Sequence, residues 1–254
     1  TVGASTASLT AANKLVIGSI QTDSLFFNGD IAEILIFNSA LSNLELDALE
    51  ANLATQYNIA IQSPNFGLTA HWKLDESNPS MIATDSTGNY DATLVTMTGN
   101  EWTLGAVNNA LTFDGDNDYL SFDNYTNNPN NVTLSAWVKL SASDAGGAEI
   151  ISIDGDIGLR IHNTGRLGGF HGISGSSFRS INSNRADLID NQWHHVVFSY
   201  NASTTTSTLY IDGAVDISLN TGALVHHAGE GSRIGRHPTS INYHFNGQLD
   251  DVRL

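Results

Sequence analysis

Short stretches in which apolar and polar residues alternate recur along most of this 254-residue chain. Residues 110–113 and 119–122 flank the turn sequence Asp-Gly-Asp-Asn-Asp, whose residues tolerate positive φ. The same pattern predicts further strands at residues 132–140, 149–153, 158–162, 193–201, 208–212 and 246–254. Because alternate residues share one face of a strand, the pattern predicts an all-β fold, an antiparallel sandwich of two sheets.

One segment departs from this pattern. Within residues 42–55, Leu46, Leu49 and Leu53 recur at helical spacing. Ser42 and Glu45, three residues apart, form a capping box at its start. The sequence therefore predicts one short helix in the N-terminal segment.

A phrase near the start of the chain returns near its end. Residues 27–34 read Phe-Asn-Gly-Asp-Ile-Ala-Glu-Ile, and residues 245–252 read Phe-Asn-Gly-Gln-Leu-Asp-Asp-Val. An Ile-Gly pair precedes both copies, at Ile17 and at Ile234. Repetition at this spacing is typical of serial copies of one unit. We therefore expect a piece of a longer tandem array, with a boundary in the polar sequence Gln-Ser-Pro-Asn at residues 62–65.

The charge of the chain limits its partners. It carries 26 acidic and 10 basic residues, a net charge of −16, which argues against nucleic acid and anionic membranes as ligands. It has no cysteine and no apolar run near the ~20 residues of a membrane span. This composition favours a secreted or cell-surface bacterial protein.

Seven short motifs in order resemble the laminin-G-like, concanavalin-A-like jelly-roll family. They lie at residues 67–76, 85–89, 110–115, 134–138, 192–197, 209–213 and 246–253. By this resemblance, residues 63–254 form one sandwich domain that lacks its final strand-helix segment. Residues 1–62 resemble the C-terminal part of a preceding repeat.

The resemblance implies a module that binds rather than catalyses, with a glycan or a protein as ligand and often with calcium. We expect a non-catalytic binding module of a large, repetitive, adhesin-like protein. Two alternatives stay open: a structural repeat of an extracellular fibre without a ligand, and an accessory domain of a polysaccharide-degrading enzyme.

The N-terminal segment raises a question of assembly. Strands predicted at residues 15–17 and 27–37 lack the opening strands with which they should pair. We therefore expect Ile31, Ile34 and Ile36 to stay unburied in an isolated chain. Residues 1–61 would pack against neighbouring repeats or chains, in a head-to-tail array that propagates as a filament.

Two patterns suggest catalysis without supporting it. Residues 45–50 match the Glu-x-Asp-x-x-Glu string of laminarinase-type glycoside hydrolases, which resemble this sandwich. In a helix, however, Glu45 and Asp47 point about 200° apart, whereas a retaining glycosidase needs two facing carboxyl groups. His194 and His195 are neighbours on a predicted strand and face opposite sides, so we expect structural roles.

Calcium is the cofactor that the acidic residues favour, because Ca²⁺ takes six to eight oxygen ligands in flexible geometry. The predicted ligands are Asp75, Asn89, Asp91 and Asp250. Asp250 is the first choice, since related sandwich enzymes place a structural calcium between an early strand and an aspartate at this position. The alternative is that these residues cap turns and meet solvent.

Basic residues gather in the glycine-rich segment 158–181. They are Arg160, His162, Arg166, His171 and Arg179. Arginine forms paired hydrogen bonds with carboxylates, so this cluster predicts a site for an acidic sugar or another carboxylate. The alternative is charge balance on a solvated sheet.

Overall fold

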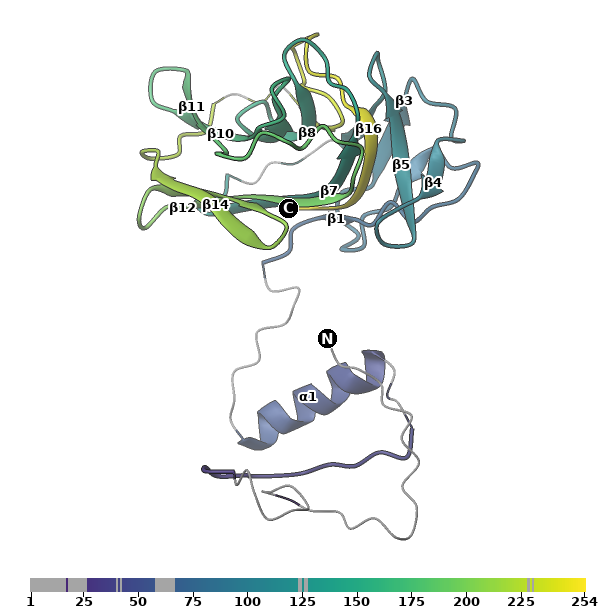
Figure 1. Cartoon of the computed structure of the whole chain (residues 1–254), viewed down its shortest axis with the longest axis vertical. Coiled ribbons are helices and arrows are strands. Elements are labelled where there is room, and N and C mark those ends of the chain that lie inside the picture. The colour runs from purple at the N-terminus through teal and green to yellow at the C-terminus, as the bar shows by residue number, and fades with distance from the viewer. Residues whose placement is uncertain are drawn as a thin grey trace. The chain divides into compact units, whose positions relative to one another are not determined.

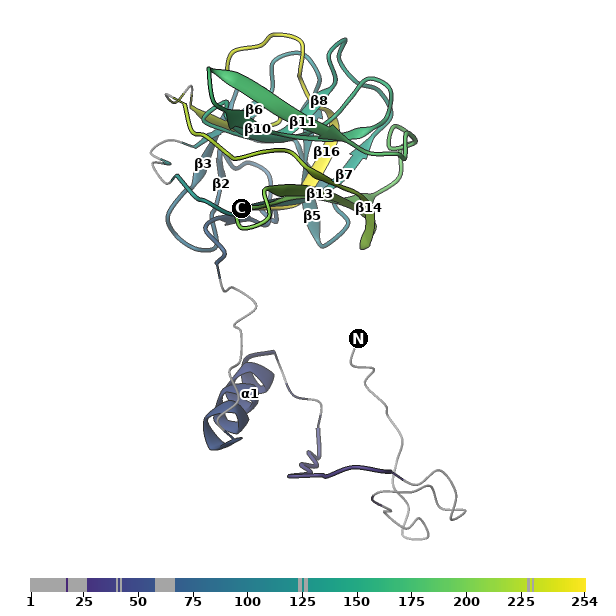
Figure 2. The same cartoon turned by 90° about the vertical axis from the view of Figure 1, so that its left-hand side faces the viewer.

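The computed structural model describes residues 17, 27–39, 41, 43–57, 67–122, 125, 128–227, 229 and 231–254. The chain separates into two compact units, Thr1–Phe66 and Gly67–Leu254. In the described residues, the fold has two antiparallel sheets and one short helix, which confirms the predicted all-β sandwich. Figures 1 and 2 show the two sheets of the second unit lying face to face.

The first sheet, sheet A, has the strand order β14-β13-β12-β7-β16-β5-β4, and β1 also pairs with β16. Its strands are β1 (His71–Trp72), β4 (Trp102–Leu104), β5 (Asn109–Asp114), β7 (Val132–Leu140), β12 (His194–Asn201), β13 (Thr206–Ile211), β14 (Ala214–Asn220) and β16 (Asn246–Arg253).

The second sheet, sheet B, has the order β11-β10-β9-β8-β15-β6-β3-β2. Its strands are β2 (Ile82–Ala83), β3 (Ala92–Val95), β6 (Tyr119–Phe122), β8 (Ala148–Ile153), β9 (Ile157–Ile161), β10 (Leu167–Ile173), β11 (Ser177–Asn182) and β15 (Ser232–Ile234).

The core lies between the two sheets and follows the alternation of the strands. In β12, Val196, Phe198 and Tyr200 are buried, while the residues between them are half-buried. Gly169 of β10 faces Phe198, and a Cβ at this glycine would lie 2.2 Å from the Phe198 ring. Close approach of the sheets therefore explains why β10 carries glycine at this inward position.

Strand β16 occupies a central place in sheet A, between β5 and β7 (Figure 1). Leu249 lies opposite Leu111 of β5 and opposite Val138 of β7. Val252 lies opposite Trp72 of β1. The last strand therefore joins the first strand of the sandwich to its middle.

The first unit contains the helix α1 (Asn43–Tyr57), which confirms the predicted helix at residues 42–55. Ser42, the predicted cap, lies outside the described residues. The predicted strand at residues 27–37 was wrong: these residues form no strand in the structure. A strand requires a hydrogen-bonded partner, and no described segment pairs with this one.

The apolar residues of this segment are exposed, as expected. Ile31 and Ile34 are both 46% exposed, and Ile36 is 65% exposed. Of the other predicted strand, residues 15 and 16 lie outside the described residues, as does the predicted boundary at residues 62–65. The interpretation of residues 1–62 as the tail of a repeat stays a prediction.

Candidate functional site

The outer face of sheet B carries a row of side chains that point away from the core. Leu159 and Ile161 of β9 are buried between the sheets, so Arg160 between them faces outward. Gly158 lies opposite Phe170 of β10, which brings Phe170 to the same face as Arg160. Sheet B thus places an arginine beside an aromatic ring.

These residues border a cavity of about 220 Å³. Its lining is Gly155, Arg160, Phe170, Phe178, Ser180, His237 and Tyr243. The guanidinium carbon of Arg160 lies 4.2 Å from the centroid of the Phe170 ring and 4.4 Å from that of the Tyr243 ring. Both rings attract the cation through their π faces and hold the guanidinium group in place.

Under Arg160 lies a fully buried carboxylate, Glu149 of β8. Its Oε2 is 2.9 Å from Nε of Arg160, an ion pair whose alignment falls short of a hydrogen bond. Neither carboxylate oxygen has a hydrogen-bond partner among the described residues. Burial raises the pKa of Glu149 to about 7, although the charge of Arg160 opposes this rise.

Gly158 makes room for this arrangement. A Cβ there would lie 2.3 Å from the Phe170 ring and 2.8 Å from Oε1 of Glu149. Both separations are shorter than the van der Waals contact distance of a Cβ atom, so any side chain at this position would displace the Phe170 ring or the Glu149 carboxylate. The cavity therefore combines aromatic walls, the hydroxyl groups of Ser180 and Tyr243, and an ion pair whose carboxylate is buried.

Of the five basic residues predicted to bind a ligand, Arg160 lines this cavity and the other four do not. His162 contacts Oδ1 of Asn182 through Nε2 at 2.9 Å. His171 is buried in the core, where its ring centroid lies 4.7 Å from that of Tyr200. Arg179 lies exposed on β11, opposite His171.

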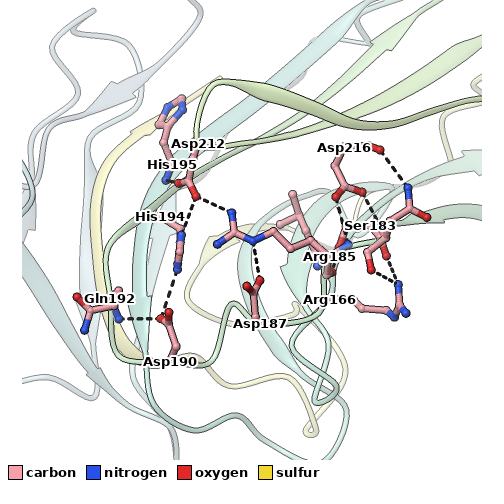
Figure 3. A network of polar contacts seen from close by, with 12 residues as sticks. Arg166, Ser183, Arg185, Asp187, Asp190, Gln192, His194, His195, Asp212 and Asp216 are labelled. Carbon is pink, nitrogen blue, oxygen red and sulfur yellow. Dashed lines mark hydrogen bonds and ion pairs between the residues drawn. The ribbon is translucent and has the colours of Figure 1, made fainter.

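Arg166 belongs to a polar network that includes the segment after β11 (Figure 3). It donates hydrogen bonds to the backbone carbonyl groups of Ser183 and Asn184, the latter at 2.9 Å. These bonds hold the segment that follows β11. Arg166 therefore has a structural role in the arrangement that the structure shows.

Two further residues of that network tie the same segment to the turn between β13 and β14. Arg185 contacts Asp187 at 2.6 Å and Asp212 at 2.7 Å. His194 is buried and lies 2.9 Å from Asp212 and 3.3 Å from Asp190 (Figure 3). The contacts of His194 with Asp190 and Asp212 lie within the protein, which agrees with the structural role expected for His194.

A second cavity, of about 270 Å³, lies beside β1 and β16. Its lining is His71, Lys73, Asp75, Val107, Asn108, Asp250, Asp251 and Arg253. Asp250 is fully buried, and its Oδ2 accepts a hydrogen bond from the Val107 amide at 2.7 Å. Its Oδ1 has no partner among the described residues. Burial, together with the charges of Asp251 and Asp75, raises the pKa of Asp250 to about 6.

The structure brings together two of the four predicted calcium ligands, Asp75 and Asp250, at this cavity. Asn89 and Asp91 do not line it. Asp91 accepts a hydrogen bond from the Asp85 amide at 2.8 Å, and Asn89 donates one to the Thr87 hydroxyl group. Among the described residues, no three or more His, Asp and Glu side chains form a group that could hold a metal ion. Calcium binding stays a prediction.

The sequence alone missed most of the cavity on sheet B. Phe170 and Phe178 lie in the same glycine-rich segment as Arg160, and their aromatic rings were the signal that could have found them. His237 and Tyr243 come from the connection before β16 and could not have been placed.

In the part of the chain that the structure describes, no helix is long and apolar enough to cross a membrane.

Known proteins share this architecture. Domain 4 of a GH43 extracellular arabinanase from Geobacillus stearothermophilus, solved with arabinotriose, has a TM-score of 0.55 at 20% identity, over 73% of this chain and 90% of that one. The receptor-binding domain of the botulinum neurotoxin C/D mosaic serotype has a TM-score of 0.56 at 16% identity, over 74% of this chain and 48% of that one. At these identities, the two likenesses show the fold alone.

A curated relative and a family model extend the comparison. A protein of Paraclostridium bifermentans called Non-toxic nonhemagglutinin is 28% identical over 207 residues, which are 79% of this chain and 16% of the relative. The chain thus spans about a sixth of that relative's length. The family model of the concanavalin A-like lectin/glucanases superfamily, of the laminin G type, matches residues 114–254. Since this match covers more than half of the chain, the protein belongs to the concanavalin A-like lectin/glucanase superfamily.

Proposed function

We propose that this chain is a non-catalytic module that binds a glycan in the cavity beside Arg160 on sheet B. The observation that carries the proposal is the arginine held between Phe170 and Tyr243 at the wall of a cavity. Aromatic rings pack against the apolar faces of sugar rings, and a fixed guanidinium group donates hydrogen bonds to hydroxyl or carboxylate oxygens. Ligand sites commonly combine such apolar walls with a few fixed polar groups.

The relatives support a binding module. The botulinum neurotoxin domain is described as receptor-binding, and the arabinanase domain was solved in complex with arabinotriose. We propose by analogy that this chain acts in a secreted or cell-surface protein of adhesin-like, repetitive construction. The fold hosts many functions, so the proposal rests on the cavity and uses the relatives as support.

A second candidate is an accessory domain of a polysaccharide-degrading enzyme. It is favoured by the arabinanase domain, 90% of which aligns with this chain. The two candidates share the glycan ligand and differ in the protein that carries the module. A third candidate, a fibre repeat without ligand, predicts that the cavity on sheet B binds no sugar.

The test is a glycan array probed with the full chain, containing both neutral and acidic sugars. Phe178→Ala removes a ring that is 52% exposed at the cavity wall, so we expect at least about tenfold weaker binding. Leu219→Ala is the matched control, because Leu219 is 49% exposed on β14 of sheet A. Equal binding by the Phe178 variant and the wild type would contradict the proposed site.

We also propose that calcium binds at the second cavity through Asp75 and Asp250. The unpartnered Oδ1 of buried Asp250 supports this, since an ion would satisfy it. Lys73 and Arg253 also line the cavity and partly balance the two carboxylates. Bound calcium would clamp the segment after β1 to β16 and stabilise the sandwich.

A further inference from the structure

Two segments of this chain carry the same apolar pattern in opposite environments. In residues 245–254, the apolar side chains Phe245, Leu249, Val252 and Leu254 are all buried. Their counterparts in residues 27–36 are Phe27, Ile31, Ile34 and Ile36. Each of these is exposed, Phe27 by 57%. The segment at residues 27–36 therefore has the sequence of a buried strand without its surroundings.

The surroundings that such a strand needs are visible at β16. It pairs with β7 along one edge and with β5 and then β1 along the other. Leu249 and Val252 are buried in the core that the two sheets enclose. A segment with this pattern thus fits a slot between two strands, where both its backbone edges and its apolar face are covered.

The first segment also carries small residues at two closely packed positions of β16. A Cβ at Gly247 would lie 2.3 Å from the Lys139 carbonyl oxygen of β7, so the slot requires glycine there. The first segment has Gly29 at this position. The buried, partly unsatisfied Asp250 is replaced by Ala32, a small uncharged residue that a buried position accepts at lower cost.

The described part of the first unit leaves the apolar side of this segment open. Glu33 accepts a hydrogen bond from the Tyr57 hydroxyl group at 2.8 Å, which joins the segment to α1 through a polar contact. Ile31 and Ile34 remain exposed despite this contact. In the second unit, the slot between β5 and β7 is already occupied by β16.

We infer that residues 27–37 are a donor strand for a second sandwich of this superfamily. The acceptor is a sandwich whose slot between the strands equivalent to β5 and β7 lacks its own last strand. The donor segment takes the place of β16 there, with Ile31 and Ile34 in the positions of Leu249 and Val252. This inference is independent of the proposed glycan site.

The first test places the donor sequence in the slot that the structure defines. Residues 245–247 already match residues 27–29, so seven substitutions complete the exchange in the full chain: Gln248→Asp, Leu249→Ile, Asp250→Ala, Asp251→Glu, Val252→Ile, Arg253→Leu and Leu254→Ile. Apolar volumes are nearly kept, whereas Asp250→Ala removes the acceptor of the Val107 amide, so we expect cooperative unfolding with a Tm lowered by no more than roughly 10 °C. A chain with Leu249→Asp in place of Leu249→Ile should not fold. Loss of cooperative unfolding in the exchanged chain itself would overturn the inference.

The second test supplies the strand from outside. The chain truncated after His244 is refolded with a fluorescent peptide of residues 27–37, and peptide anisotropy is measured together with tryptophan fluorescence. A peptide of residues 245–254 is the positive control, and a peptide with Ile31→Asp and Ile34→Asp is the negative control. Binding by the first two peptides supports donation. Binding by the 245–254 peptide without binding by the 27–37 peptide contradicts it.

Discussion

Glu149 is an acidic residue whose carboxylate is removed from water. Its carboxylate is fully buried, and Arg160 is its charged neighbour. Burial of a carboxylate disfavours the ionised form, and one imperfectly aligned partner does not offset that cost. The ion pair therefore fixes the guanidinium group at the cavity wall at the expense of stability at neutral pH.

The first residue-scale prediction concerns this cost. The pKa of Glu149 rises from 4.5 to about 7 on folding, so between these pH values the folded state holds a proton that the unfolded state has released. Stability therefore falls as pH rises through this window and levels off above it. Glu149→Gln removes the titrating group, so the fall in the free energy of unfolding between pH 5 and pH 7.5 should be about 2 kcal/mol smaller in this variant than in the wild type. Urea unfolding at both pH values measures this.

The comparison with the wild type isolates Glu149, because Asp118 and Asp250 shift in the same direction and are present in both chains. Burial raises the pKa of each of these aspartates to about 6. If the Glu149→Gln variant loses as much stability with rising pH as the wild type does, the ion pair is not the source of the dependence.

The second residue-scale prediction separates the two roles open to Asp250. In Asp250→Asn, the amide oxygen still accepts the hydrogen bond from the Val107 amide, while the buried charge disappears. Without calcium, we expect a higher Tm than that of the wild type at pH 7.5. With calcium, the wild type should gain stability and the variant should gain little, as measured by differential scanning calorimetry. Equal gains in both chains would remove Asp250 from the calcium site.

At the scale of elements, Asp85 organises the loop between β2 and β3. Its buried carboxylate accepts hydrogen bonds from the backbone amides of His71, Thr87, Asn89 and Tyr90. Burial acts to raise the pKa of Asp85, but hydrogen bonds from Thr87 and His71 outweigh it and lower the pKa. Because folding lowers this pKa, the ionised carboxylate stabilises the folded state at pH values above the pKa of an unfolded aspartate. The stabilisation is lost as the pH falls through the pKa of Asp85 in the folded state.

Asp85→Ala should therefore destabilise the sandwich by about 3 kcal/mol or more, because several buried amides lose their acceptor. Chemical denaturation at pH 7 measures the loss. Asp116→Ala, at an exposed aspartate in the turn between β5 and β6, should change stability by less than about 0.5 kcal/mol. Similar losses in the two variants would show that the loop gains nothing specific from Asp85.

Elements were predictable where their signal was local. Alternation located β7 and β12, and helical leucine spacing located α1. Strand β10 was missed because Gly168, Gly169 and Gly172 interrupt the apolar pattern, although close approach by other groups explains these glycines. Strand β11 was missed because all its side chains but that of Ile181 are exposed, so apolar and polar residues do not alternate along it. Residues 27–37 show the opposite failure: their pattern is that of a strand, but pairing depends on a partner that the pattern does not supply.

The candidate site was less predictable than the fold. Arg160 was predicted as a site residue because basic residues are few in this acidic chain. Its partner Glu149 follows from the register of β8 and β9, and its second aromatic neighbour Tyr243 comes from a connection far along the chain. Contacts of this kind depend on topology, which no short stretch of sequence encodes.

At the scale of the whole molecule, one acidic chain contains two units of different character. The unit Gly67–Leu254 has a continuous core between its sheets, whereas the described part of Thr1–Phe66 presents exposed isoleucines. A net charge of −16 opposes nonspecific association between copies, and the inferred strand donation would give them a specific contact through backbone pairing.

The central place of β16 also sets the order of events during biosynthesis. Trp72, near the start of the sandwich, pairs with Val252, near its end. A ribosome or a translocation channel releases a polypeptide from the N-terminus onward, so sheet A stays divided until residues 246–253 emerge. Pairing across such a long sequence separation is slow. The sandwich therefore cannot close during synthesis until its last strand has emerged.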